Sequence, residues 1–358
     1  MRVLALSDVH TDHKQNQQWV EELSSTDFLH DVLVVAGDIS DQLHQLRATL
    51  ISLREKFLEV FFCPGNHDLW HKRDERLNGV VSAHSIDRLQ GLLQLCCEIG
   101  VKTEPAEVNG VWICPIFSWY HSDFDREPDI PGAYDITKVM SDFSMCEWPE
   151  GLSPLDDSLA RHFDALNDPA VSNLAAELRR QRREGRRPPV ITFSHFLPLQ
   201  ELLPEKRMLF HPNLAKACGS DWILPRIREL SPLVHVFGHT HFNWDAEIDG
   251  VRYIQRPLGY PRVSPTVFLP VPPSLSASTP PPSSARTFPR SVRRSTRSDS
   301  LRLSLPPSSS LSLLSFLSHC LFLSLYVFPV TFSFLSFFSH SFSLSLSLCV
   351  FSLTLSLS

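Results

Sequence analysis

Five short polar motifs, each directly after a short apolar run, constrain the fold of this 358-residue chain more than any other feature. In chain order the motifs are Asp8-Val9-His10, Gly37-Asp38-Ile39-Ser40-Asp41, Gly65-Asn66-His67-Asp68, Ser194-His195 and Gly238-His239-Thr240-His241. The apolar runs before them, rich in β-branched residues, cover residues 2–6, 32–36, 60–62, 190–193 and 233–237. We predict that each run is a buried strand, so that polar side chains follow the carboxyl ends of five strands.

Helical patterns separate these predicted strands, at residues 15–24, 43–56, 85–99 and 222–230. Strands that alternate with helices predict an α/β fold, and in such folds functional sites form beyond the carboxyl ends of the strands. We therefore expect the five motifs to meet at one edge of a sheet. Asn109-Gly110 and Asp249-Gly250 each lie between two apolar runs and predict hairpins, so the second half of the domain should also contain antiparallel strands.

The motifs together supply two carboxylates, one amide oxygen and four imidazoles, and they contain no thiolate. The candidate metal ligands are Asp8, His10, Asp38, Asn66, His195, His239 and His241. Oxygen and imidazole donors suit Mn, Fe, Zn or Mg better than a soft, sulfur-binding ion. This set is large enough for two adjacent divalent ions, an arrangement that is typical of enzymes that hydrolyse phosphate esters.

The order of residues within the motifs predicts a role for each. Asp38 is expected to bridge two ions that lie about 3.5–4 Å apart, and a hydroxide held between the ions would attack phosphorus in line. His67 follows the ligand Asn66 and is placed to protonate the leaving alkoxide as a general acid. We expect Asp41 to hold His67 in the required tautomer and to keep it protonated.

Each motif taken alone also has a purely structural explanation. An aspartate such as Asp8 at a junction between strand and helix is often an N-cap, and glycines are common in turns. A single histidine such as His195 is more often a structural residue than a ligand. The conjunction of five motifs in one order favours the metal site over these separate explanations.

The same motifs resemble those of the calcineurin-like metallophosphoesterases. The resemblance spans residues 1–262 and implies a four-layer sandwich in which two mixed β-sheets lie between helices. It implies one metal held by Asp8, His10, Asp38 and His241, and a second held by Asp38, Asn66, His195 and His239. Where the Ser/Thr protein phosphatases of this superfamily carry Arg-Gly and Glu, this chain has Gln42-Leu43 and Asp68, so that activity is not implied.

We therefore expect a metal-dependent phosphoesterase that hydrolyses a phosphomonoester or a phosphodiester. The alternative from a different class is a catalytically inactive scaffold of the same fold that binds a protein partner. Such scaffolds usually lose the acid histidine or several ligands. This chain retains His67 and all seven candidate ligands, which favours the enzyme, and the metal content of the purified protein discriminates the two.

Charge and cysteine spacing limit the partners and the compartment. Residues 1–262 carry 27 basic and 38 acidic side chains, which disfavours specific nucleic-acid binding. The basic cluster within residues 179–187 is better explained as a solvated helix end than as an anion site. The six cysteines of this region show no disulfide or zinc spacing, which is typical of reduced thiols. Because the first motif begins at Asp8, we expect no cleaved signal peptide and a cytoplasmic protein.

Residues 118–189 form the least regular part of the predicted domain. A segment of this kind beside a metal site is expected to shape substrate choice. It begins near Trp119 and Tyr120, which either stack on a base or sugar of the substrate or are packing residues of an edge strand. We favour packing.

Residues 263–358 have a different composition, rich in Ser, Leu, Pro and Phe, and contain no Asp, Glu, Lys or Arg after Arg302. One interpretation is a membrane anchor, because residues 317–335 are apolar enough and nearly long enough to span a bilayer. The other is translated intron, since these four residue types have all-pyrimidine codons and Val263-Ser264 can be encoded by a splice-donor sequence. The Ser-Leu alternation has a period of two instead of the 3.6 of a membrane-spanning helix, so we favour translated intron over an anchor. The predicted organisation is a metallophosphoesterase domain at residues 1–262 and a low-complexity tail, disordered or an artefact of the gene model, at residues 263–358.

Removal of residues 263–358 is expected to leave the melting temperature and the hydrolytic activity unchanged, because the predicted strand at residues 251–255 and the closing segment 259–262 complete the domain. Solubility should improve, since a long uncharged Leu/Phe/Ser segment promotes aggregation. Transcript reads spliced after codon 262 would support translated intron. Tail peptides recovered from a membrane fraction would contradict it and support the anchor.

Overall fold

The first sheet contains three parallel strands whose carboxyl ends carry the first three motifs. The computed structural model describes residues 1–72 and 83–261. In this part the strands are β1 (Val3–Leu6), β2 (Val32–Ala36) and β3 (Glu59–Cys63), paired in the order β1-β2-β3. All three coincide with the predicted strands to within one residue. Their side chains alternate, so that Val32 and Val34 face one hydrophobic core whereas Leu33 and Val35 face another.

The second sheet contains six strands and is mixed. They are β4 (Ala106–Val108), β5 (Val111–Pro115), β6 (Val190–Phe193), β7 (Val234–Phe237), β8 (Trp244–Ile248) and β9 (Val251–Gln255), in the order β4-β5-β6-β7-β9-β8. The four inner strands are parallel, and each edge strand pairs with its neighbour in antiparallel fashion. Both hairpins turn at the predicted dipeptides, where Asn109, Gly110, Asp249 and Gly250 all have positive φ, as the tight turns that suit twisted strands require.

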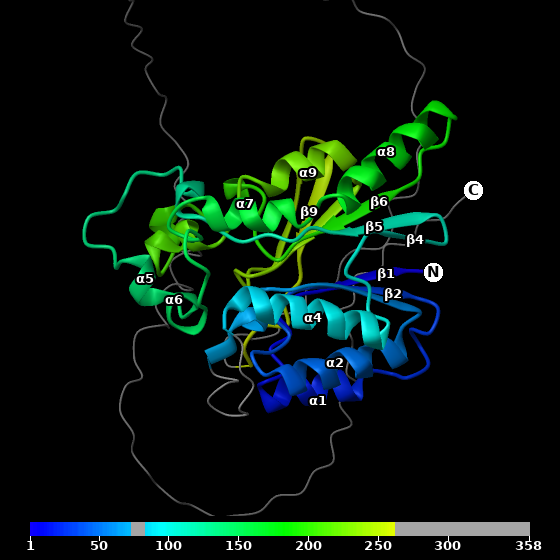
Figure 1. Cartoon of the computed structure of the whole chain (residues 1–358), viewed down its shortest axis with the longest axis horizontal. Coiled ribbons are helices and arrows are strands. Elements are labelled where there is room, and N and C mark those ends of the chain that lie inside the picture. The colour runs from blue at the N-terminus through cyan, green and yellow to red at the C-terminus, as the bar shows by residue number, and fades with distance from the viewer. Residues whose placement is uncertain (73–82, 262–358) are drawn as a thin grey trace, which may run out of the picture. The chain divides into compact units, whose positions relative to one another are not determined.

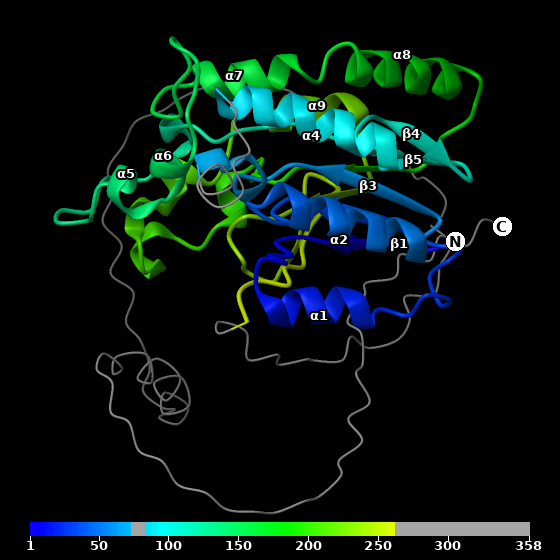
Figure 2. The same ribbon diagram turned by 60° about the horizontal axis from the view of Figure 1, so that its bottom comes forward.

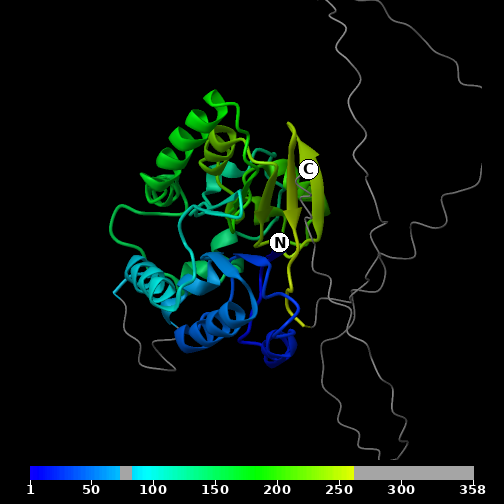
Figure 3. The same cartoon turned by 90° about the vertical axis from the view of Figure 1, so that its right-hand side faces the viewer.

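Helices cover the outer face of each sheet (Figures 1 and 3). On the first sheet lie α1 (Lys14–Glu22), α2 (Leu43–Lys56) and α4 (Ser85–Ile99), and on the second lie α7 (Ser158–Ala165), α8 (Ala170–Arg183) and α9 (Ile223–Leu230). Between the sheets, Val34 and Phe61 pack with Ile113, Phe193 and Val236. The predicted four-layer α/β sandwich is confirmed. The second sheet is mixed as expected, whereas the first is parallel throughout its described strands.

Short helices gather at the end of the sandwich where the parallel strands finish (Figures 1 and 2). They are η1 (His67–Leu69), η2 (Ser122–Phe124), α5 (Ile136–Val139), α6 (Asp142–Met145), η3 (Gln200–Leu202), η4 (Lys206–Met208) and η5 (Pro212–Ala217). A buried ion pair links two of these segments, because the Lys206 ammonium lies 2.5 Å from the carboxylate of Asp125. Trp119 and Tyr120 are 1% and 0% exposed, so this pair packs in the interior as we favoured, but it follows β5, which is an inner strand and not an edge strand.

The remaining predictions about surface and compartment have separate outcomes. Arg180 pairs with Glu177 and Glu184 on and beside α8, as expected of a solvated helix end. All six cysteines in the described residues are free thiols. Within residues 1–72 and 83–261, none of the helices combines the length and the apolarity that a membrane span requires. The tail at residues 263–358, its proposed anchor and the boundary at residue 262 lie outside the described residues.

Candidate metal centre

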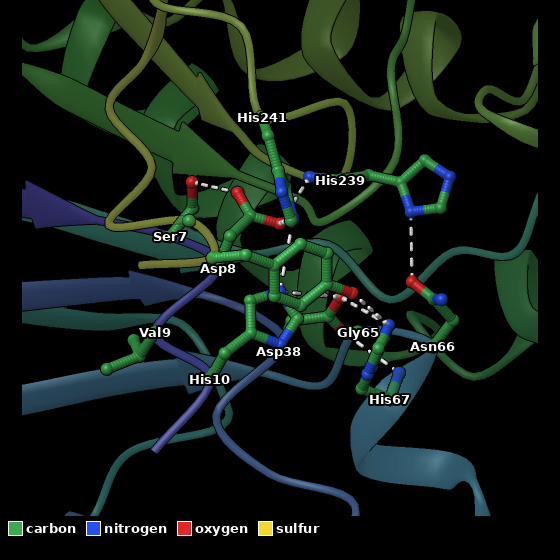
Figure 4. A network of polar contacts seen from close by, with 12 residues as sticks. Ser7, Asp8, Val9, His10, Asp38, Gly65, Asn66, His67, His239 and His241 are labelled. Atoms are coloured by element: carbon green, nitrogen blue, oxygen red, sulfur yellow. Dashed lines mark hydrogen bonds and ion pairs between the residues drawn. The ribbon is translucent and has the colours of Figure 1, made fainter. Parts of the chain in front are cut away.

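Side chains from the ends of five parallel strands meet at one edge of the sandwich, and Figure 4 shows those that follow β1, β2, β3 and β7. The loop after β1 supplies Asp8 and His10, the loop after β2 supplies Asp38, and the loop after β3 supplies Asn66. His195 follows β6, and His239 and His241 follow β7. The structure therefore brings together all seven candidate ligands, which are up to 233 positions apart in the sequence.

One group of donors consists of Asp8, His10 and His241, whose ligand atoms all lie within 4.8 Å of one another. The Nε2 atoms of His10 and His241 are 3.1 Å apart, and Oδ1 of Asp8 lies 3.4 Å from Nε2 of His241. The backbone N–H of His239 donates to the same Asp8 oxygen at 2.8 Å. Three donor atoms thus converge on one small volume.

A second group consists of Asp38, His195 and His239, joined by the amide of Asn66. The Asn66 oxygen lies 2.9 Å from Nε2 of His195 and 2.9 Å from Nδ1 of His239. Oδ2 of Asp38 lies 3.5 Å from Nε2 of His195 and 4.0 Å from Nε2 of His10. Asp38 is therefore the carboxylate that lies between the two groups.

The charge states of these side chains fit divalent cations. Burial lowers the pKa of His10 to about 3 and the pKa of His195 and of His239 to about 4, so the imidazoles are neutral, which is the form that binds metal. Burial alone would raise the pKa of Asp8, but His241 and neighbouring histidines lower it below its usual value. Burial and the nearby carboxylates raise the pKa of Asp38, a crowding that a cation relieves.

The facing ring nitrogens of two histidines also suit a cation. The Nε2 atoms of His10 and His241 are 3.1 Å apart, and each presents a lone pair to the site when the proton of its ring lies on Nδ1. The donor set, which contains no sulfur, therefore fits one or more divalent ions of the Mn, Fe, Zn or Mg type.

Most of the candidate ligands have a strained backbone. The φ angles are 53° at Asp8, 44° at His10, 57° at Asp38, 75° at His239 and 58° at His241, all in the left-handed region. Each such non-glycine residue costs on the order of 1–3 kcal/mol and persists only where the surrounding structure enforces it. Concentration of this strain at the strand ends is typical of a functional site.

Two glycines leave room for the ligands. A Cβ atom at Gly65 would overlap Oδ1 of Asp38, and a Cβ atom at Gly37 would overlap Nδ1 of His195. Gly37 also has a φ of 79°, whereas the backbone of Gly65 is within the ordinary range. These residues are therefore more than turn glycines, because side-chain atoms at either position would displace a ligand.

Asp68, to which sequence reasoning gave no role, organises the loop that carries Asp38. Its carboxylate accepts the backbone N–H groups of Asp38, Ile39, Ser40 and Gly65 at 2.8–3.1 Å. Burial raises the pKa of Asp68 to about 6, although these four donors favour its charged form. One sequence feature could have indicated this role: the third motif ends in the short Asp68, where protein phosphatases have the longer Glu.

His67 lies beside Asp38, with 3.9 Å between Nε2 of His67 and Oδ2 of Asp38. The potential ligand atoms of His10, Asp38 and His67 all lie within 4.8 Å of one another. The Tyr260 hydroxyl lies 3.2 Å from Nε2 of His67. Burial, together with His10 and His241, lowers the pKa of His67. The Asp41 carbonyl accepts from the Arg88 guanidinium at 2.8 Å. The roles of general acid for His67 and of its orienting partner for Asp41 stay predictions.

This chain is similar to known proteins in both sequence and structure. The profile of the calcineurin-like phosphoesterases matches residues 1–243. The acyl-carrier-protein phosphodiesterase PptH of Mycobacterium tuberculosis is 29% identical over 268 residues, which is 72% of this chain and 78% of PptH. The crystal structure of the phosphopantetheinyl hydrolase PptH from that organism matches with a TM-score of 0.52 and 28% identity, over 73% of this chain and 90% of that one. The resemblance drawn from the motifs is confirmed.

We expect Gly65→Ala to weaken Mn²⁺ binding at least about tenfold in calorimetric titration of the metal-free protein, because the added methyl group displaces the Asp38 carboxylate. The matched control is Gly91→Ala on the exposed side of α4, where an added Cβ would meet nothing within 4 Å. It should keep the Mn²⁺ affinity and raise the free energy of unfolding by about 1 kcal/mol. Wild-type Mn²⁺ affinity in a folded Gly65→Ala protein would contradict the proposed ligand geometry.

Proposed function

Because this chain belongs to the calcineurin-like phosphoesterase family, and is therefore a metal-dependent phosphoesterase, we propose that it works with two divalent ions. The observation that carries this proposal is the position of Asp38 between two groups of donors. Asp8, His10 and His241 would hold one ion, Asn66, His195 and His239 would hold the other, and Asp38 would contact both. The completeness of this set supports an enzyme over an inactive scaffold.

Bound divalent ions supply Lewis acidity, since they polarise phosphoryl oxygens and lower the pKa of water. The side chains of this site would hold the ions in position and exclude bulk water. Asp8, Asp38, Asn66 and His195 are at most 2% exposed. Electrostatic interactions are stronger in such an environment than in water.

His67 is the residue that we propose as general acid. Its side chain is 13% exposed, whereas those of His10 and His195 are 0% exposed, so the His67 ring can reach a leaving group from the edge of the site. Burial lowers its pKa, and the negative charge of a bound phosphate beside the ring acts in the opposite direction. The proton would pass from the imidazole to the departing oxygen as the P–O bond breaks.

For the substrate we propose a phosphodiester that links a phosphopantetheine arm to a serine of a carrier protein. The similarity to PptH, a phosphodiesterase for acyl carrier protein, supports this class over a phosphomonoester. The leaving group would then be a serine alkoxide, which is too basic to depart without a proton. A general acid next to the metal site suits this chemistry.

His67→Ala should retain the full complement of metal but lose about 10²–10⁴-fold in the rate on an alkyl phosphodiester, the usual contribution of a general acid. The loss should be much smaller for a nitrophenyl ester, whose leaving group needs little protonation. The measurements are metal analysis and the kcat for matched alkyl and nitrophenyl diesters. Equal losses for the two esters, or loss of one metal ion, would assign His67 a different role.

Incubation of a holo-carrier protein with the Mn²⁺-loaded enzyme should convert it to the apo-carrier, which intact-protein mass spectrometry detects as the loss of the phosphopantetheine group. A chelator or the Asp38→Asn substitution should abolish the conversion, whereas Gly91→Ala should not affect it. An unchanged holo-carrier, together with rapid hydrolysis of nucleotide monoesters, would contradict the proposed substrate and leave the two-metal proposal in place.

A further inference from the structure

Asp142 is a buried carboxylate that connects the irregular segment between β5 and β6 to the candidate metal centre. It is the first residue of α6 and is 2% exposed. Its Oδ1 atom accepts from Nδ2 of Asn66 at 2.8 Å and from Nε1 of Trp70 at 2.6 Å, and its Oδ2 atom accepts from the Tyr120 hydroxyl at 3.0 Å. Burial raises the pKa of Asp142, whereas the three donors act in the opposite direction and favour the form that only accepts hydrogen bonds.

The first of these bonds fixes the orientation of the Asn66 amide. A side-chain amide can present either its oxygen or its nitrogen to a neighbour, and rotation by half a turn exchanges the two. Oδ1 of Asp142 already accepts from the Trp70 N–H, which can only donate, so this oxygen is an acceptor toward Asn66 as well. The Asn66 nitrogen therefore faces Asp142, and the Asn66 oxygen faces the opposite way. That oxygen lies 2.9 Å from a ring nitrogen of each of His195 and His239, as Figure 4 shows for His239. Asp142 therefore directs a candidate ligand atom into the site.

The second bond acts on the candidate general acid. The Trp70 indole, held through its N–H by Asp142, stacks on the His67 imidazole with ring centroids 3.6 Å apart and an interplanar angle of 25°. His67 is held on another side by Tyr260 at 3.2 Å. A single carboxylate thus restrains a candidate metal ligand directly and the candidate acid through one intervening ring.

We propose that Asp142 is a positioning residue that sets the orientation of both Asn66 and His67, so that metal binding and leaving-group protonation depend on the same side chain. This inference rests on the proposed two-metal function and assigns a role to a residue outside the five motifs. Outer partners that orient metal ligands typically contribute about 10–100-fold to metal affinity or activity.

Substitution of Asp142 tests the metal arm. Asp142→Ala should weaken one of two Mn²⁺ binding events about 10–100-fold in calorimetric titration of the metal-free protein and leave the other unchanged. Asp142→Asn should recover most of the affinity, because its amide oxygen still accepts from Asn66 and Trp70 while the Tyr120 hydroxyl turns to accept from the new N–H. Tyr120→Phe is the matched control, since it removes the third hydrogen bond of the same carboxylate without touching the Asn66 or Trp70 contacts, and should keep the Mn²⁺ affinity.

Substitution of Trp70 tests the acid arm. Trp70→Phe keeps an aromatic ring against His67 but deletes the N–H that Asp142 accepts. It should keep both Mn²⁺ affinities and lower kcat on an alkyl diester more than on a nitrophenyl diester, with KM little changed. Equal loss on the two esters would contradict the link between Asp142 and His67.

The outcomes separate this inference from the function on which it rests. If the wild-type protein binds no second ion or hydrolyses no phosphodiester, the proposed function fails. If the wild-type protein does both, and Asp142→Ala matches Tyr120→Phe in both Mn²⁺ affinities and in the ratio of the two ester rates, Asp142 has only a structural role and the inference alone is overturned. Should Asp142→Ala not fold, Trp70→Phe decides through the rates on the two esters: a larger loss on the alkyl diester supports the inference, and an equal loss or no loss on both overturns it.

Discussion

Asp38 is a buried carboxylate with two other carboxylates, Asp8 and Asp68, nearby. The rest of the site has to stabilise its negative charge. Burial and like charge both raise the pKa of Asp38 and oppose its ionisation, whereas the backbone N–H of His67 donates to it at 2.8 Å and favours the charged form. One such hydrogen bond offsets only part of the cost of burying a charge. Divalent cations would supply the remaining stabilisation of this buried charge. We therefore regard metal binding as necessary for an ionised Asp38.

The fold meets this requirement by collecting the remaining donors from strand ends. Parallel strands in both sheets finish at the same edge, so that β1, β2, β3, β6 and β7 deliver side chains to one place without long loops. This arrangement strains the backbone, because most of the ligands have a left-handed conformation. The four backbone hydrogen bonds of Asp68 offset part of that strain. Gly65 leaves space for the Asp38 carboxylate, and Gly37 leaves space for the His195 imidazole.

Sequence reasoning predicted the strands, the principal helices and the convergence of the motifs because these depend on local patterns of apolar residues and on a general property of α/β sheets. It gave no role in the site to Asp68, Asp142 or Tyr260. Asp142 is 76 positions from Asn66, and Tyr260 is 193 positions from His67. Contacts of this kind follow no spacing rule. They depend on how the segment between β5 and β6 and the segment after β9 pack against the loops that carry the five motifs.

X-ray diffraction at the manganese absorption edge, from crystals of the protein grown with Mn²⁺, tests the central claim most directly. The account predicts two anomalous peaks about 3.5–4 Å apart, with the Asp38 carboxylate between them. One peak should contact Asp8, His10 and His241, and the other should contact Asn66, His195 and His239, with no density bonded to His67. A single peak, or a pair of peaks away from Asp38, would contradict the account.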